Sequence, residues 1–464
     1  MDQNQPGIQP GRLPPEQYAS NFSDAHVPLT RAQALVEAER CYYCYDAPCI
    51  TACPTAIDIP SFIQRIAQEN NRGAAQAILL ANPLGGMCAR VCPTEMLCEQ
   101  ACVRNSAESK PVEIGLLQRF ATDAYFAQPE SPQNPPLFTR AAVTGKKVAV
   151  IGAGPAGLAA AHGLARRGHD VTLFDARPKL GGLNEYGLAT YKTTDGFAQK
   201  EVDWLLSIGG ITPQTNQALG RDFTLGHLTS DYDAVFLGMG LAGVNALGIE
   251  ALPLLGLRPA VEFIAELRQA ASPAEVAVGQ TVVVIGGGMT AVDASVQSRK
   301  LGAREVTMVY RRGAEGFSAS THEQEWAQKN GVSLRTWAAP KQILSEGGRV
   351  TGLRFAVTAL QNGSLAETGE QFTLAADMVL TAIGQTFVAE ALPAITLQGG
   401  RINTDASGRT SHAQVWAGGD CRFGGRDLTV EAVEQGKQAA VAIHQFLVGQ
   451  TAETTPVASS AVPN

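Results

Sequence analysis

Eight of the nine cysteines of this 464-residue chain lie between positions 41 and 102. They form two groups of four, which are Cys41, Cys44, Cys49 and Cys53, then Cys88, Cys92, Cys98 and Cys102. Thiols gathered this closely along a chain indicate either disulfides or bound metal. This part of the chain must therefore fold around its cysteines, whatever else it does.

Two of the possible uses of these cysteines are disulfides and structural zinc. Disulfides need an oxidising compartment, but the chain opens with Met-Asp-Gln-Asn-Gln-Pro and shows no basic and apolar leader, so we expect a cytoplasmic protein. Zinc is the stronger alternative, because four-cysteine zinc sites use the spacings of Cys41/Cys44, Cys88/Cys92 and Cys98/Cys102.

Iron is favoured by the order of the first group. The run C-x2-C-x4-C-x3-C-P from Cys41 to Pro54 is close to the bacterial ferredoxin run, in which the last cysteine, before proline, serves a second cluster. A second Cys-Pro pair occurs at Cys92-Pro93. Eight thiolates also match the demand of two iron–sulfur clusters, so we predict two such clusters here.

Composition limits the partners. A net charge of -7 without long runs of one sign argues against a nucleic-acid partner, which needs a basic face. No apolar stretch approaches the roughly 20 residues that span a bilayer, so we expect no membrane insertion. The length suggests about three domains.

The cysteine region should be a small α-helical domain covering residues 1–140. A helix is predicted over Arg31–Arg40, and apolar residues at helical spacing over Ile59–Ala81 predict packing between the two cysteine groups. The sequence Pro-Glu-Ser-Pro-Gln-Asn-Pro-Pro within residues 128–136 can hold neither a helix nor a central strand, which puts the domain boundary there.

A first dinucleotide-binding motif follows. The strand Lys147–Ile151 leads into Gly152-Ala-Gly154-Pro-Ala-Gly157, an alanine-rich helix ends near Gly168, and the strand Val171–Phe174 ends at Asp175. Glycines let a pyrophosphate approach the backbone at the helix N-terminus, and an acid about 20 residues on accepts a ribose hydroxyl. Strand, turn, helix and acid in this order make the motif specific.

A second motif runs from the strand Thr281–Ile285 through Gly286-Gly-Gly288-Met-Thr-Ala291 to the strand Glu305–Tyr310. Its second strand ends in Arg311 and Arg312 instead of an acid. These arginines either bind the 2′-phosphate of NADP or simply reach into solvent, and the pattern leaves both open.

The order of the two motifs matches two-domain flavoprotein reductases, with FAD first and the nicotinamide second. We therefore expect an α/β fold with an FAD domain of residues 141–250 and 376–450, interrupted by an NAD(P)H domain of residues 251–375. The resumed part should contain a strand at Met378–Ile383, the turn Val415–Asp420 and a helix over Thr429–Phe446. Residues 451–464, rich in Thr, Ala, Ser and Pro, should be a disordered tail.

The route of the electrons follows from what is absent in the sequence. Disulfide reductases of this architecture need a redox-active cysteine pair beside the flavin, but Cys421 stands alone. The electrons should therefore leave through the clusters, one at a time. Hydride transfer between stacked rings needs no acid or base, so we assign no catalytic residue.

Beyond these motifs, the chain resembles the N-terminal half of the dihydropyrimidine dehydrogenase family over roughly residues 31–445. The resemblance is carried by the cysteine pattern with Pro54-Thr55, by Asp58-Ile59-Pro60, by the segment Asn82-Pro-Leu-Gly-Gly-Met-Cys-Ala-Arg-Val-Cys-Pro93, and by Gly115-Leu-Leu-Gln-Arg-Phe120. It implies that one 4Fe-4S cluster binds to Cys41, Cys44, Cys49 and Cys102, and the other to Cys53, Cys92, Cys98 and Gln118. Counting cysteines alone would make Cys88 the eighth ligand instead.

The resemblance also implies the nucleotide contacts. For FAD they are Val91, Gly152, Gly154, Pro155, Ala156, Asp175, Leu183, Lys192 and Asp420. For the nicotinamide dinucleotide they are Gly288, Met289, Thr290, Ala291, Arg311, Arg312, Ala382, Ile383, Gly384 and Thr429. Asp175 stands where the family usually has glutamate. Ser318 replaces an arginine of the NADPH-using members, which favours NADH.

The implied activity is that of an electron-input subunit. NADH would reduce FAD, and two clusters would pass electrons to an FMN-containing partner, in a heteromer expected to be a heterotetramer, that reduces uracil or thymine at the 5,6 bond. No segment is left for a (β/α)8 barrel, so we expect the pyrimidine site on that partner. The alternatives are the small subunit of glutamate synthase, another partner-fed reductase such as a ferredoxin:NADP oxidoreductase, and a zinc-stapled nucleotide-binding scaffold without redox function.

Overall fold

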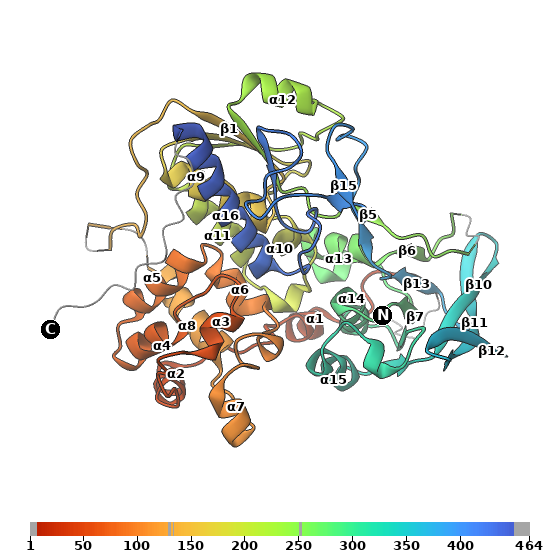
Figure 1. Ribbon diagram of the computed structural model, residues 1–464. Helices are drawn as coiled ribbons and strands as arrows, with labels where there is room; N and C mark the ends of the chain where they lie inside the picture. The colour runs from red at the N-terminus through yellow and green to blue at the C-terminus, as the bar shows by residue number, and fades with distance from the viewer. Residues whose placement is uncertain (1–6, 129–130, 133, 250–252, 450–464) are drawn as a thin grey trace. The chain divides into compact units, whose positions relative to one another are not determined.

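The computed structural model describes residues 7–128, 131–132, 134–249 and 253–449. The tail predicted for residues 451–464 lies outside them. Two compact units make up the chain. Unit 1 comprises Met1–Pro129, Gly181–Glu201 and Leu241–Val388, and unit 2 comprises Glu130–Leu180, Val202–Gly240 and Ala389–Asn464. Figure 1 shows the helices and strands of both units.

The N-terminal part of unit 1 is helical, as predicted. Its helices are α1 (Pro15–Asn21), α2 (Arg31–Ala38), α3 (Pro48–Ala52), α4 (Ile59–Ala67), α5 (Asn71–Ala81), α6 (Gly85–Val91), the 3₁₀ turn η1 (Thr94–Met96), α7 (Val103–Glu108) and α8 (Ile114–Phe126). The predicted periodic stretch Ile59–Ala81 is two helices instead of one. Glu69 between them has φ of +59°, which ends α4, and Asn70 caps α5 by accepting the Gly73 N–H.

The core of this helical part comes from one face of each helix. On α4 the buried side chains recur at helical spacing, and they pack against buried residues of α5 and α8. The central members are Phe62, Ile63, Ile66, Ala74, Ile78, Leu117 and Ala121. Cys98 belongs to the same core, and Cys41, Cys49, Cys53 and Cys102 pack against it. The apolar pattern therefore brings both cysteine groups to one core.

The rest of unit 1 contains a parallel five-stranded sheet in the order β6-β13-β7-β8-β9. The strands are β6 (Leu257–Pro259), β7 (Thr281–Ile285), β8 (Glu305–Val309), β9 (Val332–Arg335) and β13 (Met378–Thr381), and the helices are α13 (Ala260–Gln269), α14 (Met289–Lys300) and α15 (Thr321–Lys329). Strands β7 and β8 match the second predicted motif.

Strand β13 differs from the sequence prediction, which made it part of the resumed FAD domain. Met378 pairs with Val282 and Thr381 with Ile285, so the strand lies in the sheet of the second motif. A buried four-residue strand carries no signal for the sheet it joins, because hydrogen bonding along a ladder is independent of the side chains. Predicting this pairing needed tertiary information.

An antiparallel sheet that the sequence analysis missed lies between β9 and β13 in the chain. Its strands are β10 (Ala338–Glu346), β11 (Arg349–Gln361) and β12 (Ser364–Ala375). The turns that join them contain Gly347-Gly348 and Asn362-Gly363, all with positive φ, as tight hairpins require. The short strands β5 (Gly243–Val244) and β14 (Gln385–Thr386) also pair.

Unit 2 is built on a parallel sheet in the order β17-β4-β1-β2-β3. Its strands are β1 (Lys147–Ile151), β2 (Asp170–Phe174), β3 (Ile211–Gln214), β4 (Ala234–Leu237) and β17 (Val415–Ala417), and β15 (Leu397–Gln398) pairs with β16 (Arg401–Ile402). The helices include α9 (Pro155–Arg166), α12 (Leu225–Asp231) and α16 (Thr429–Val448), while α11 (Phe197–Leu206) starts in unit 1 and ends in unit 2.

Helices α9 and α16 pack very closely (Figure 1). A Cβ on Gly436 of α16 would lie 2.1 Å from the Ala156 carbonyl oxygen, so only glycine fits there. The two helices that flank the first glycine-rich turn are thus held together by backbone contact. The fold class predicted from the sequence is confirmed, with a helical part and two nucleotide-binding sheets.

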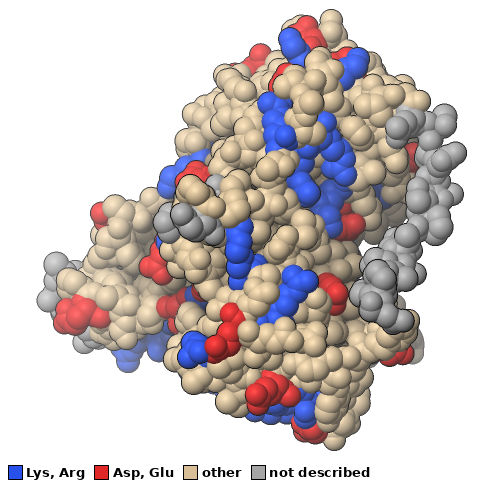
Figure 2. Space-filling model, turned by 90° about the vertical axis from the view of Figure 1, so that its left-hand side faces the viewer, with Lys and Arg blue, Asp and Glu red and all other residues tan. Residues whose placement is uncertain are grey.

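The surface carries mixed charge. Figure 2 shows one face on which basic side chains gather along the middle while acidic side chains are scattered around them. Over the residues that the structure describes, no helix has both the length and the apolar character needed to cross a membrane.

Candidate functional site

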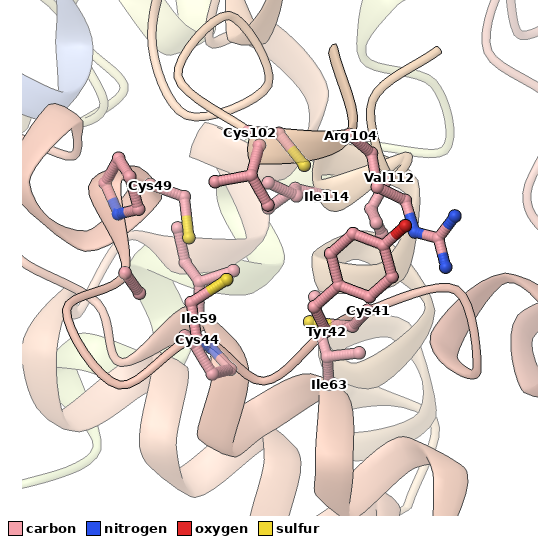
Figure 3. A pocket seen from close by; sticks show the side chains of 14 residues that line it. Cys41, Tyr42, Cys44, Cys49, Ile59, Ile63, Cys102, Arg104, Val112 and Ile114 are labelled. Atoms are coloured by element: carbon pink, nitrogen blue, oxygen red, sulfur yellow. The ribbon is translucent and has the colours of Figure 1, made fainter. Parts of the chain in front are cut away.

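Four cysteines from both sequence groups line one pocket in unit 1. They are Cys41, Cys44, Cys49 and Cys102, which also form the first ligand set implied by the family resemblance. Figure 3 shows their sulfur atoms facing a common space, with Tyr42 and Arg104 at its edge. Ile59, Ile63, Val112 and Ile114 provide its apolar wall. Helices α4 and α8 therefore hold together cysteines that are up to 61 positions apart.

The pocket disfavours bare thiolates. Burial, and after it the neighbouring Cys41 and Cys102 thiols, raise the pKa of the Cys49 thiol to about 12. Burial is also the main reason why the pKa of Cys41 is raised. Thiolates in such surroundings need a cation beside them, and iron bound to sulfur supplies that charge. The residues present therefore fit a bound iron–sulfur cluster.

In the described part of the chain, no three His, Cys, Asp or Glu side chains are grouped to hold one metal ion. Four ligands of a cubane cluster bind four different iron atoms, so they stand further apart than ligands of one zinc ion, which share a bond length of about 2.3 Å to the same centre.

The second group lies deeper in unit 1. The pKa of Cys92 is raised, first by a hydrogen bond with Cys88, then by burial and by the nearby thiols of Cys98 and Cys53. The pKa of Cys98 is raised by burial above all. The structure therefore brings Cys53, Cys92 and Cys98 together, and it leaves Cys88, which is buried on α6, beside them.

Gln118 is held by a hydrogen bond on its amide. It lies on α8, only 8 % exposed, and its Nε2 donates to the Gly85 carbonyl at 2.7 Å. This bond uses the amide nitrogen and orients the side chain, so the amide oxygen is the atom that can bind iron. Cys88 lies on α6, the short helix that begins at Gly85. The choice between Gln118 and Cys88 as the eighth ligand thus stays a prediction.

Two carboxylates that the sequence analysis missed, a buried one and a half-buried one, support the segments around these cysteines. Glu201 accepts the Gly86 N–H at 2.8 Å and the Met87 N–H at 3.2 Å, which fixes the start of α6, and burial raises its pKa to about 8. Glu99, next to Cys98, accepts the Gly115 N–H at 2.9 Å, and burial raises its pKa to about 7. Neither occurs in a motif, so no sequence signal pointed to them.

In unit 2 the first glycine-rich turn has the geometry that a pyrophosphate requires. Gly152 has φ of +93°, and a Cβ there would lie 2.3 Å from the Gly238 carbonyl oxygen. A Cβ on Gly157 would lie 1.8 Å from the Gly152 carbonyl oxygen. Helix α9 begins at Gly154 without a side-chain cap, with Pro155 and Ala156 in its first turn. Its first N–H groups thus suit an anionic ligand.

Asp175 lies at the end of β2, where the fingerprint requires an acid. Its Oδ2 accepts the Ala153 N–H at 2.7 Å and its Oδ1 accepts the Arg177 N–H at 2.8 Å, so the carboxylate is fixed against the turn. Burial raises its pKa, while the two backbone bonds oppose that change. This carboxylate fits the ribose end of a dinucleotide.

Asp420 and Thr429 belong to the C-terminal segment of unit 2. Burial, and after it the nearby Asp427, raise the pKa of Asp420 to about 6. The Gly419 N–H donates to Gln435 Oε1 on α16 at 2.8 Å, which ties the Gly-Gly-Asp turn to that helix. Thr429 is the first residue of α16, which begins without a side-chain cap. Asp175 and Asp420 thus follow two strands of the same parallel sheet, β2 and β17.

Three of the FAD residues implied by the resemblance lie in unit 1 instead. Val91 ends α6, and Leu183, 38 % exposed, begins α10 (Leu183–Tyr186). Lys192 ends the 3₁₀ turn η2 (Thr190–Lys192) and is buried. Its Nζ lies 2.8 Å from Asp293 Oδ1 and 2.7 Å from Glu323 Oε1, and these two carboxylates raise its pKa against the effect of burial.

The second glycine-rich turn, in unit 1, is built like the first. Gly288 precedes α14, which has no side-chain cap and starts with Met289, Thr290 and Ala291. A Cβ on Gly286 would lie 2.2 Å from the Ala382 carbonyl oxygen, so the end of β13 touches this turn. Ile383 and Gly384 follow directly, held by Asn245, which donates its backbone N–H to Gly384 O and its Nδ2 to Ile383 O.

Arg311 and Arg312 lie at the end of β8 with exposed side chains. Only their backbone is held, since Thr358 Oγ1 donates to Arg311 O and the Trp337 N–H donates to Arg312 O. Ser318 contacts the glycine-rich turn instead, because its N–H donates to Gly287 O at 3.0 Å. The structure therefore brings Ser318 to the turn and leaves both arginines free to reach a ligand or solvent.

Family comparisons agree with this division of the chain. Residues 18–130 match the family described as dihydropyrimidine dehydrogenase domain II, 4Fe-4S cluster. Residues 146–436 match the family described as pyridine nucleotide-disulphide oxidoreductase. The iron–sulfur and nucleotide-binding character predicted from the sequence is confirmed by these matches.

Curated relatives match over nearly the whole length. The NAD-dependent dihydropyrimidine dehydrogenase subunit PreT of Escherichia coli strain K12 is 34 % identical over 437 residues, which cover 94 % of this chain and 99 % of the relative. The glutamate synthase [NADPH] small chain of the same organism is 32 % identical over 464 residues, covering 95 % of this chain and 97 % of the relative.

Solved structures agree in fold. Mycobacterium tuberculosis FprA in complex with NADPH superposes with a TM-score of 0.56 at 18 % identity, covering 66 % of this chain and 85 % of the other. Thioredoxin reductase of Lactococcus lactis gives 0.54 at 23 % identity, with 66 % and 99 % covered. At such low identity these likenesses concern the fold alone.

Proposed function

The chain belongs to the pyridine nucleotide-disulphide oxidoreductase family, and from this premise we propose that it is the electron-input subunit of a dihydropyrimidine dehydrogenase. The finer parts of this proposal are the substrate uracil or thymine, the preference for NADH, the presence of two clusters and the FMN-containing partner. The relatives that carry the name PreT support it, because they align over nearly their full length.

One observation carries the proposal. Two uncapped glycine-rich turns, at Gly154 and Gly288, occur in the same chain as a pocket lined by Cys41, Cys44, Cys49 and Cys102. A bound FAD would accept a hydride as two electrons, and bound iron–sulfur clusters would pass these electrons on one at a time. A chain with sites for both is suited to convert one kind of transfer into the other.

The residues of this chain would bind the cofactors, orient them and keep water away from them. Asp175 would hold the ribose of FAD and the first turn of α9 its pyrophosphate, while Asp420 would hold the ribityl or phosphate part. Apolar side chains around the first cysteine pocket exclude water, which strengthens the hold of the thiolates on iron. No side chain of the chain would be needed as an acid or base, because hydride transfer to a bound flavin requires no proton transfer from the protein.

The preference for NADH rests on Ser318. Ser318 contacts the second glycine-rich turn through its backbone N–H, and its short neutral side chain supplies no positive charge to a 2′-phosphate. Arg311 and Arg312 remain available to such a phosphate because their side chains are exposed. We therefore propose NADH as the physiological donor and NADPH as a weaker one.

The test is an anaerobic pull-down of the tagged chain, followed by assays of the eluate for uracil-dependent oxidation of NADH and NADPH. An FMN-containing partner and uracil-dependent turnover are expected. The matched control is Cys44→Ser, which should abolish turnover with uracil but keep NADH oxidation by an artificial dye. A partner that instead converts glutamine and 2-oxoglutarate would replace the pyrimidine assignment by that of a glutamate synthase small chain, whose similarity is nearly as high.

A further inference from the structure

Three tyrosines are exposed in the loop that joins Cys41 to Cys49. Tyr42 is 54 %, Tyr43 38 % and Tyr45 fully exposed. We call these three residues the aromatic loop. Isolated exposed apolar side chains are common on protein surfaces, but three exposed tyrosines within four positions concentrate aromatic surface in one short loop, and exposed aromatic surface is typical of interaction sites.

The aromatic loop is held in place instead of being a frayed segment. Tyr43 has φ of +52°, a conformation that bulky residues rarely adopt, and its hydroxyl donates to the Ala38 carbonyl at 3.2 Å. The hydroxyl of Tyr42 donates to Glu108 Oε1 at 3.2 Å, and the Arg104 guanidinium carbon lies 4.0 Å from the centre of its ring. The exposure of the Tyr42 and Tyr43 rings is therefore imposed by the fold.

The two arginines next to the loop are already paired with carboxylates. Arg40 lies 2.5 Å from Glu37 and 3.7 Å from Glu108, and Arg104 also pairs with Glu108. Arg40 in addition donates to the Pro111 and Lys110 carbonyls. The loop itself offers a partner three exposed aromatic side chains and the exposed carboxylate of Asp46. This is the composition of a protein–protein contact and not of a nucleic-acid or lipid headgroup contact.

The aromatic loop also lies beside the first cysteine pocket. Tyr42 lines the same pocket as Cys41, Cys44, Cys49 and Cys102, and Figure 3 shows it at the pocket edge. The rate of electron transfer falls steeply with distance, so a protein that takes electrons from this pocket must approach closely. The aromatic loop surrounds Cys44 in the sequence and thus lies on the shortest covalent path from a ligand to the surface.

We propose that the aromatic loop is the docking surface for the redox partner that takes electrons from this chain. The proposal rests on the proposed function and names the surface that function needs. Each NADH gives up two electrons and a proton as NAD⁺ forms. The electrons cross the contact one at a time, and the pyrimidine on the partner takes up both of them with two protons, one of which comes from solvent.

The experiment uses the full chain with its FMN-containing partner. Tyr45→Ala is the main variant because the ring is fully exposed, so its removal should not disturb folding; Tyr45→Phe is the conservative variant. The matched control is Leu360→Ala on β11, where the side chain is 56 % exposed and thus similar in exposure to Tyr42. For each protein we would measure iron and flavin content, reduction of an artificial dye by NADH, and the Kd for the partner.

Tyr45→Ala should weaken partner binding about tenfold, the effect of losing an aromatic interface residue. The KM for the partner should rise accordingly, while dye reduction, cofactor content and kcat at saturating partner stay unchanged. Tyr45→Phe should retain most of the affinity. Unchanged affinity in Tyr45→Ala, or an equal loss in Leu360→Ala, would overturn the docking proposal.

These outcomes separate the two proposals. If the unaltered chain passes electrons to its partner and the tyrosine variants bind equally well, only the docking surface is refuted. If the unaltered chain neither binds an FMN-containing partner nor supports uracil-dependent NADH oxidation, the proposed function fails, and the docking proposal is overturned with it.

Discussion

Replacing Lys192 by methionine tests the charge balance of a buried cluster of three charged side chains in unit 1. The Lys192 ammonium lies 2.8 Å from one carboxylate oxygen of Asp293 and 2.7 Å from one of Glu323. The three side chains are 10 %, 5 % and 15 % exposed. Methionine keeps the length and apolar stem of lysine, so the substitution removes the charge and little volume.

The expected cost follows from the geometry. At an effective dielectric constant of about 20, each pair contributes roughly 6 kcal/mol of attraction, and desolvation of the three charges offsets most of it. Removing the cation leaves two carboxylates buried side by side. Loss of one partner from a buried pair costs about 3–5 kcal/mol, and we expect a loss of that size in the free energy of unfolding at pH 8.

The pH dependence has a definite sign. In the unaltered chain the carboxylates raise the pKa of Lys192 above 10.5, so its stabilising effect is fully present below that pH. In the variant, burial without a cation raises the pKa of Asp293 further above its usual 3.8. The folded state then binds more protons than the unfolded state, so the variant loses stability as pH rises above about 4. Its deficit at pH 5.5 should be smaller than at pH 8, by about 1.4 kcal/mol for each pH unit that lies below the raised pKa.

Urea unfolding at pH 5.5 and 8 provides the assay, followed by the fluorescence of Trp326, whose ring centre lies 6.0 Å from that of Tyr191. The control is Lys329→Met on the same helix as Glu323, where the ion pair is exposed and should contribute less than about 1 kcal/mol. Adding Asp293→Asn to the methionine variant should recover most of the loss. A deficit below about 1 kcal/mol, or one independent of pH, would refute the reasoning.

Three further predictions concern the cofactor sites. Gly157→Ala should lower the ratio of bound flavin to protein at least about tenfold, because the added methyl group collides with the first glycine-rich turn. Gly226→Ala on α12 should leave this ratio unchanged, and flavin retention in the Gly157 variant would contradict the prediction. Gln118→Ala should lower the iron content and alter the electron paramagnetic resonance spectrum of one reduced cluster, whereas Cys88→Ala should leave the iron content and the spectrum unchanged. The reverse result would make Cys88 the ligand. Arg311→Ala should raise the KM for NADPH about tenfold and that for NADH less than about twofold, so equal effects on the two donors would mean that the arginine does not contact a 2′-phosphate.

Much of the fold follows from local sequence. The strands Lys147–Ile151 and Thr281–Ile285 were predicted with the bounds that the structure has, because each is a short apolar run directly before a glycine-rich turn. Helix α16 was predicted within two residues at its end and correctly at its start. Such features depend on neighbours in the chain, so they can be predicted without knowing the tertiary structure.

The candidate site could be predicted only in part from the sequence. The eight cysteines, Gly154, Gly288 and Asp175 stand out because their spacing is fixed by the ligand they suit. Glu201, Glu99 and Asp293 do not, because each acts on a residue far away in the sequence. A buried carboxylate looks in the sequence like any surface carboxylate, and only packing decides which of them loses its water.

The sequence by itself determined the types of site and their order along the chain. Tertiary structure alone decided which distant groups meet. It brought Cys102 to the pocket of Cys41 through α4 and α8, put β13 into the sheet of β7, and exposed the tyrosines between Cys41 and Cys49. The physical reason is that spacing and periodicity describe contacts within a few residues, whereas burial and strand pairing depend on free energies summed over the whole fold.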